Sequence, residues 1–241
     1  MSFQRKPCIF NWSGGKDSSL ALYHCLNDPT LDIKYLVTTL NAGVNRVSMH
    51  GVREELIIRQ AEAIGIPLYP IRLPETPGIL QYEQTMKYHL QKFKEIGIKH
   101  AIYGDIFLEE VKKYREDKLS EMGLTGIFPL WKRETSEVMS EFLDLGFKTV
   151  IVCAQDKIEQ FVGRVIDSDI MRDLPADIDI CGENGEYHTF AFEGPIFKRP
   201  LRFRLGEKIF KEFPKPKGEK DACFSDTKTE LKSGYWYIDI F

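Results

Sequence analysis

The chain has 241 residues, of which 43% are hydrophobic and 12% aromatic, enough to bury one large core or two modest ones. Its 33 basic and 36 acidic residues leave a formal net charge of −3, so no global positive field recruits nucleic acid. No apolar run approaches membrane-spanning length, so we expect an ordinary globular protein without a membrane partner. The charge balance disfavours a nucleic-acid partner but leaves room for a local basic patch.

The cysteines indicate a reducing compartment. They are odd in number and widely spaced, with no Cys-x-x-Cys and no histidine pair at metal-binding spacing. The first seven residues also lack the apolar stretch of a signal peptide. We therefore expect reduced thiols in a cytoplasmic protein. The five cysteines are Cys8, Cys25, Cys153, Cys181 and Cys223.

The most informative stretch is the hexapeptide Ser-Gly-Gly-Lys-Asp-Ser, between an apolar run at 8–12 and a predicted helix at 19–26. Strand, glycine turn and helix start make an anion site, because unpaired amides at the helix N-terminus point into the turn. The spacing excludes the ordinary P-loop and the dinucleotide fingerprint. A glycine turn that touches no ligand is the alternative. The residues are Ser13, Gly14, Gly15, Lys16, Asp17 and Ser18.

The next elements extend this predicted site. Residues 33–40 indicate a buried strand, and its carboxyl end at Thr38 should lie beside the hexapeptide as a wall for adenine. The following loop carries His50 and leads into a predicted helix at 53–64. His50 could contact the nucleotide, the substrate or nothing at all.

Four later joints share one pattern, in which an apolar residue closes a helix, a glycine turns the chain and an apolar strand begins. This alternation predicts a parallel sheet covered on both faces. One intervening helix, at 78–96, has apolar residues at a spacing of three or four that predicts a single buried stripe. The four glycines are Gly65, Gly97, Gly123 and Gly146.

The strand predicted at 100–106 ends in a carboxylate. Asp105 falls where a parallel sheet offers its ligand edge, so it is a better functional candidate than Glu109 or Glu110. The charged run at 112–115 is typical of a solvated helix face. A strand or extended segment is expected at 126–131, followed by a helix at 134–145 and a strand at 147–153.

The C-terminal part contains a second polar turn. Residues 156–179 look helical with a break at Pro175, and the sequence Gly-Glu-Asn-Gly-Glu follows at 182–186. That turn is compatible with an Asn-Gly hairpin, or with a polar cluster that meets a substrate amine or a metal-bound nucleotide. Antiparallel strands are predicted at 201–205 and 235–241, separated by a lysine-rich connector around 215–220.

The hexapeptide matches the pyrophosphate loop (PP-loop) of the ATP pyrophosphatase superfamily, which this sequence resembles and whose members split ATP between the α- and β-phosphates. The resemblance implies that the amides around Gly14 and Gly15 and the hydroxyls of Ser13 and Ser18 grip the β- and γ-phosphates. Lys16 would neutralise charge on them. Asp17 would contact a metal or brace the loop.

Further segments narrow the resemblance to the diphthine-ammonia ligase family, over about residues 8–197. They are, in order, the PP-loop, Gly104–Ile106, Phe128–Trp131, Gly163-Arg164 with Asp167, and the turn at 182–189. The family carries a Glu-Gly-Gly-Glu-x-Glu motif in its substrate pocket. This chain keeps Glu183, Gly185 and Glu186 but has Asn184 in place of a glycine and His188 in place of the third glutamate.

The resemblance implies a Rossmann-like parallel α/β fold of the PP-loop type at 1–130, which binds ATP, and a smaller α+β substrate domain at 131–241. It implies a ligase that uses ATP and Mg²⁺ to adenylate a carboxylate, releases pyrophosphate and forms an amide with ammonia. The acid could be protein-borne, and a homodimer is compatible with the sequence. Lys16, Asp17 and Asp105 would be catalytic, Thr38 and His50 would join the PP-loop around the nucleotide, and the substrate would meet Arg164, Glu183, Gly185, Glu186 and His188.

Two other functions stay open at this point. One is a tRNA-modifying PP-loop enzyme of the thiolating or lysidine-forming type, which the near-neutral charge and the absence of closely paired cysteines disfavour. The other is a nucleotide sensor without chemistry, since binders and catalysts grip phosphate alike.

Overall fold

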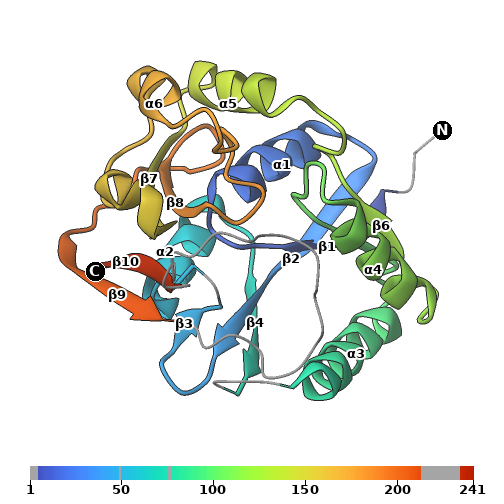
Figure 1. Ribbon diagram of the computed structural model, residues 1–241. Helices are drawn as coiled ribbons and strands as arrows, with labels where there is room; N and C mark the ends of the chain where they lie inside the picture. Colours follow the sequence, from blue (N-terminus) through green and yellow to red (C-terminus); the bar gives the residue numbers. More distant parts are fainter. Residues whose placement is uncertain (1–4, 49, 75–77, 213–233) are drawn as a thin grey trace.

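Alternating strands and helices build a mostly parallel sheet in the first half of the chain (Figure 1). The structure is a computed structural model that describes residues 5–48, 50–74, 78–212 and 234–241. The strand order is β3-β2-β1-β5-β6, with β4 paired to the later part of β2. All neighbours are parallel except β2 and β3. The strands are β1 Lys6–Asn11, β2 Leu31–Asn41, β3 Arg46–Val47, β4 Leu68–Leu73, β5 His100–Ile102 and β6 Thr125–Ile127.

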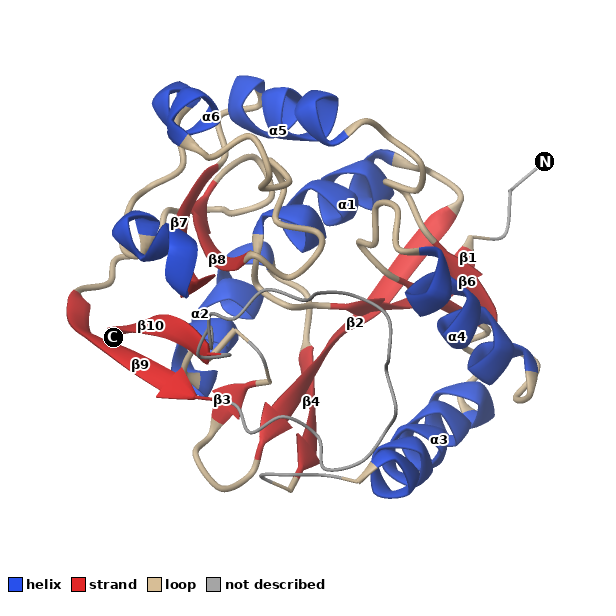
Figure 2. Ribbon diagram, viewed as in Figure 1, coloured by secondary structure: helices blue, strands red, loops and turns tan. Residues whose placement is uncertain are grey.

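A second, antiparallel sheet follows, with the order β8-β7-β10-β9. Together with the first sheet it confirms the predicted fold class, a Rossmann-like parallel sheet accompanied by a smaller α+β unit (Figure 2). The strands are β7 Lys148–Gln155, β8 Tyr187–Glu193, β9 Leu205–Glu212 and β10 Gly234–Ile240. The lysine-rich connector expected around 215–220 lies outside the described residues, as does Cys223.

The helices flank these sheets, with α3 and α4 near β6 at one end and α5 and α6 together at another (Figure 1). They are α1 Lys16–Asn27, α2 Glu54–Ile64, α3 Ile79–Glu95, α4 Glu109–Ser120, α5 Thr135–Asp144, the short 3₁₀-helix η1 Asp156–Phe161 and α6 Ser168–Asp173. Across the described ranges, none of these helices is long and apolar enough to cross a membrane.

The glycine joints are confirmed as left-handed turns, with φ of 87°, 86°, 70° and 77° at Gly65, Gly97, Gly123 and Gly146. The prediction that each joint leads into one parallel sheet is wrong for the last of them. After Gly146 the chain enters β7, whose partners are β8 and β10. The helix-glycine-strand pattern is local, whereas the identity of the sheet is decided by strands that come later in the chain.

Several elements differ in extent from the prediction. The apolar stripe of α3 is buried only at Leu90 and Phe93, whereas Ile79 at the start of the helix is 78% exposed. The strand at 100–106 stops at Ile102, and residues 156–179 contain only η1 and α6. The strand expected at 201–205 begins at Leu205, because residues 201–204 bond to the ends of β8 and β10 rather than to a ladder.

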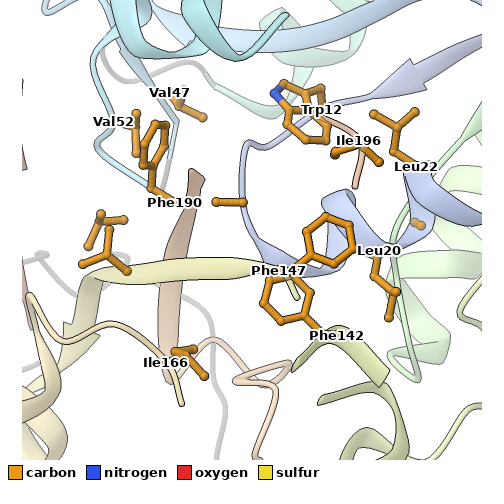
Figure 3. Packing of buried hydrophobic residues seen from close by; sticks show 14 of the residues in the cluster. Trp12, Leu20, Leu22, Val47, Val52, Phe142, Phe147, Ile166, Phe190 and Ile196 are labelled. Carbon is orange, nitrogen blue, oxygen red and sulfur yellow. The ribbon is translucent and has the colours of Figure 1, made fainter. Parts of the chain in front are cut away.

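One continuous apolar core joins the two sheets and brings α1 against the C-terminal part of the chain. In Figure 3, Phe142 of α5 and Phe147 lie below α1, near Leu20, and their rings stack with centroids 4.8 Å apart. Phe10 of β1 and Phe190 of β8 belong to the same core. This packing holds the loop at the start of α1 beside β8.

Candidate active site

The PP-loop connects β1 to α1 and is fixed by its own hydroxyls. The Ser13 hydroxyl donates to the Ser18 hydroxyl (3.0 Å) and accepts from the Gly15 amide (3.3 Å). Ser18 also bonds the Gly15 carbonyl (3.0 Å). Gly14 has a φ of 81°, and a Cβ there would lie 2.6 Å from the amide oxygen of Gln60. Only glycine therefore fits that position.

Gln60 of α2 joins three segments around this loop and is completely buried. Its amide nitrogen donates to the carbonyls of Gly14 (2.9 Å) and Ala191 (2.6 Å), and its oxygen accepts from the Trp12 indole (2.9 Å). Our sequence reasoning missed Gln60. The available signal was its place as the one polar residue among the buried positions of α2, which are Leu56, Ile57, Gln60, Ala61, Ala63 and Ile64.

Strand β8 caps the first turn of α1. The Thr189 hydroxyl accepts from the Lys16 amide (3.0 Å), and the Ala191 amide donates to the Gly14 carbonyl (2.8 Å). A Cβ on Gly15 would stand 3.1 Å from Thr189. The PP-loop is thus held between α2 and β8, which are more than 100 residues apart in the sequence. On the other side, Thr38 donates its hydroxyl to the Trp12 carbonyl (2.6 Å) and so supports the start of the loop.

Lys16 and Asp17 form a close ion pair, with the ammonium 2.8 and 2.7 Å from the two carboxylate oxygens. The Lys16 side chain is 4% exposed and lies 5.3 Å from the centre of the Tyr187 ring. Burial alone would lower the pKa of Lys16, but the Asp17 carboxylate raises it above its usual value. The ammonium therefore stays charged over the physiological range.

Two further carboxylates lie near this pair. Asp105, after β5, is 3.0 Å from the Arg115 guanidinium, so Arg115 is not part of the solvated face predicted for the run at 112–115. Glu183 accepts from the Ile106 amide (2.8 Å). Burial, which is the larger cause, and the negative charge of Asp17 raise the pKa of Glu183 to about 7. Glu183 can therefore exchange a proton near neutral pH.

Gly104 explains how these strand ends approach α1. A Cβ at this position would be 3.2 Å from the backbone of Asp17 and Ser18. The glycine lets the end of β5 lie directly against the first turn of α1.

The second polar turn leads into β8, and the Asn-Gly hairpin alternative is wrong because α6, not a strand, is the element before the turn. Glu186 is 5% exposed. One of its oxygens accepts from the Asp179 amide and the Asn184 side chain (both 3.1 Å), and the other is buried without a hydrogen bond among the described residues. Gly185 has a φ of 83°, which the turn requires.

Two histidines lie face to face beside the PP-loop. The rings of His50 and His188 have centroids 4.5 Å apart and are tilted by 33°. The His50 ring nitrogen is 3.4 Å from the place of a Cβ on Gly15. Burial, helped by the charge of Lys16, lowers the pKa of His50 to about 4, and burial with the nearby His50 holds the pKa of His188 well below its usual value. Both imidazoles are neutral at pH 7.

Arg164 is the predicted site residue that lies apart from the others. Its guanidinium is 3.2 Å from Asp173 and 5.1 Å from the centre of the Phe161 ring. Its backbone bonds Ile151 of β7 and Phe161. None of its contacts within the described part of the chain reaches the PP-loop.

Two family models match most of the chain. A family model described as diphthamide synthase N-terminal domain matches residues 7–126, and one described as diphthamide synthase C-terminal domain matches residues 134–216. The chain belongs to the diphthamide synthase family. This membership makes it an enzyme of the carbon–nitrogen ligase type.

Three curated relatives are named diphthine–ammonia ligase. The Danio rerio protein is 23% identical over 216 residues, covering 78% of this chain and 83% of that protein. Those of Schizosaccharomyces pombe and Saccharomyces cerevisiae are 21% and 24% identical over 78% and 77% of this chain, which spans only 34% and 33% of their lengths. Among solved structures, the U34-tRNA thiolase NcsA from Methanococcus maripaludis aligns with a TM-score of 0.37 at 16% identity, over 60% of this chain and 58% of that one.

Proposed function

We propose that this chain is an ATP-dependent ligase that converts the carboxyl group of protein-borne diphthine into an amide with ammonia. The observation that carries the proposal is the meeting of two distant segments: Glu183 from the turn before β8 bonds the Ile106 amide and lies in the field of Asp17. A carboxylate held by that turn would face a nucleotide held by the PP-loop. Residues 1–130 would then hold ATP, and 131–241 the acid.

In the first step an oxygen of the substrate carboxylate attacks the α-phosphorus, which forms an acyl-adenylate and releases pyrophosphate. Negative charge grows on the departing pyrophosphate, so fixed positive groups there favour the transition state. The first-turn amides of α1 and the Lys16 ammonium would supply them, with Lys16 exchanging Asp17 for a phosphate oxygen. Thr38 would line the adenine side.

Magnesium fits the carboxylates of this site. The described residues contain no cluster of three or more His, Cys, Asp or Glu groups arranged for a metal. Mg²⁺ usually takes only one or two protein carboxylates and completes its shell with phosphates and water, so Asp17, with Asp105 nearby, would suffice. Bound there, the ion would neutralise charge on the phosphates.

In the second step ammonia attacks the acyl carbon, AMP leaves, and the nitrogen loses a proton. Glu183, with a pKa of about 7, is suited to accept that proton. The neutral pair of His50 and His188 would line the pocket without adding positive charge beside Lys16. Glu186 and Gly185 would shape the turn, whereas Arg164 would need to act from a more distant surface. A homodimer remains a prediction.

The decisive assay combines the full chain with ATP, Mg²⁺, nitrogen-15 ammonium and a protein that carries diphthine. We expect AMP and pyrophosphate to form in step with nitrogen-15 incorporation into the modified residue. Lys16→Ala should reduce turnover far more than ATP binding. AMP formation without labelled amide would contradict the ammonia step, and ATP binding without any AMP would indicate a sensor.

The tRNA-thiolating alternative fits the site less well. Such chemistry generally needs catalytic or cluster-binding cysteines, which act as thiolates. The four described cysteines are buried, and burial raises the pKa of Cys25 and of Cys153 to about 12 and also raises that of Cys181. Salt-dependent binding of bulk tRNA would revive this alternative.

A further inference from the structure

A basic pocket lies on the outer face of α2, away from the proposed reaction. Its volume is about 250 Å³. One wall comes from α2 and the other from the extended segment that follows β8. The lining residues are Arg59, Ala63, Arg199, Pro200, Leu201 and Arg202.

The pocket is built by backbone contacts. The Lys198 amide donates to the Ala63 carbonyl (2.8 Å), and the Leu201 amide donates to the Phe192 carbonyl (2.7 Å). These bonds lay residues 198–202 across the last turn of α2, with Leu201 buried as an apolar floor. The Arg59 guanidinium then donates to the Arg202 carbonyl (2.6 Å). These hydrogen bonds fix the segment 198–202 against α2, and with it the two walls of the pocket.

The three arginines around the pocket form no ion pair among the described residues. Arg59, Arg199 and Arg202 are all exposed, and none has a carboxylate within ion-pair distance in the part of the chain that the structure describes. Glu55 and Glu62 share the exposed face of α2 with Arg59, yet neither forms an ion pair with it there. Like charges gathered around one cavity repel each other, so an anion between them is stabilised.

We propose that this pocket binds a small multivalent phosphate, of which inorganic pyrophosphate is the simplest example. Guanidinium groups match phosphate oxygens with paired hydrogen bonds. A volume of about 250 Å³ exceeds the roughly 30 Å³ share of one water several-fold but falls below the roughly 300–1,000 Å³ of drug-sized ligand sites. The pocket therefore has room for two phosphoryl groups. The compact cluster, on a chain with a net charge of −3, also favours a small anion over a long polyanion.

The pocket differs from the PP-loop site in its residues and in the face of the helix that it uses. Arg59 points outward, whereas Gln60, the next residue, is buried against Gly14. An anion on the outer face would lie one residue from the side chain that fixes the PP-loop. The proposal goes beyond the ligase function and does not depend on it.

The test is a titration of the full chain with inorganic pyrophosphate, followed through the Nε–H signals of nitrogen-15-labelled arginines. Arg→Lys variants assign Arg59, Arg199 and Arg202, and Arg164, already paired with Asp173, serves as the internal control. We expect saturable shifts at the three pocket arginines and none at Arg164. The double variant R199A/R202A should bind at least about tenfold more weakly at this site, because charge-assisted hydrogen bonds are lost.

Site-resolved signals separate this pocket from any binding at the PP-loop. Equal shifts with sodium chloride at matched ionic strength would overturn the proposal. So would shifts that only an acidic peptide or a short RNA produces, since the occupant would then be a macromolecule. Unchanged backbone spectra of the double variant establish that a weaker response reflects lost binding rather than lost folding.

Discussion

Glu183→Gln tests the electrostatics of the proposed site most directly. In the folded protein, burial and the Asp17 charge raise the pKa of this carboxyl from 4.5 to about 7. The native state therefore binds a proton more tightly than the unfolded chain between these values, and its stability falls as pH rises from about 4.5 to about 7. Above pH 7 the ionised group gives a constant penalty.

The size of that penalty follows from the same pKa. A shift from 4.5 to about 7 corresponds to about 3 kcal/mol, which screening at this partly exposed group reduces to about 1–2 kcal/mol. Glutamine keeps an oxygen for the Ile106 amide but cannot ionise. Relative to the wild type, the variant should be little changed at pH 5 and about 1–2 kcal/mol more stable at pH 8.

Urea unfolding at pH 5, 6, 7 and 8 measures this difference. Glu110→Gln, on the exposed face of α4, is the matched control and should show no such trend. A constant difference between Glu183→Gln and the wild type across these pH values would refute the reasoning. In the ligase assay the variant should lose most of its amide formation, because the proposed proton acceptor is gone.

Three further predictions follow, two about contacts of the PP-loop and one about an ion pair of β10. Gln60→Leu should destabilise the fold by about 2–4 kcal/mol in urea unfolding, because it leaves buried backbone and indole groups unpaired, whereas Gln91→Leu on the exposed face of α3 should change little. Gly14→Ala should cost at least about 2 kcal/mol and weaken ATP binding measured by calorimetry, since its φ is 81° and its Cβ would clash; the unhindered Gly78→Ala should not. Asp239 bonds two arginines that lower its pKa to about 2, so its contribution of about 1–2 kcal/mol should be present above pH 4 and fade as pH falls toward 2. Asp239→Asn should remove this acid dependence, and an unchanged acid unfolding profile would contradict it.

Local chemistry made part of this molecule predictable. The strand, glycine turn and helix around Gly14 follow from backbone rules that act within a few residues, as do the left-handed turns at Gly65 and Gly146. The sequence also placed Asp105 beyond the carboxyl end of β5, and its functional role stays a prediction. In each case the cause lies in neighbouring residues, so the sequence alone contains it.

Other parts depend on contacts between distant residues. Gln60 meets Ala191 across 131 positions, and Arg115 turns from a helix face to Asp105. Neither partner can be identified from spacing. The same holds for β7, which looks like another strand of the parallel sheet until β10 is in place beside it. Long-range pairing decided these outcomes.

The contact between Thr189 and the Lys16 amide links the two halves of the proposed reaction. Amides at the start of a helix are the groups that bind phosphate, and one of them is already bonded to a residue of β8. Thr189 lies three residues after Glu186 and six after Glu183, on the segment proposed to hold the acid. A shift of that segment on acid binding would therefore change which PP-loop amides are free for the nucleotide. In the proposed reaction, this contact would couple binding of the acid to binding of ATP.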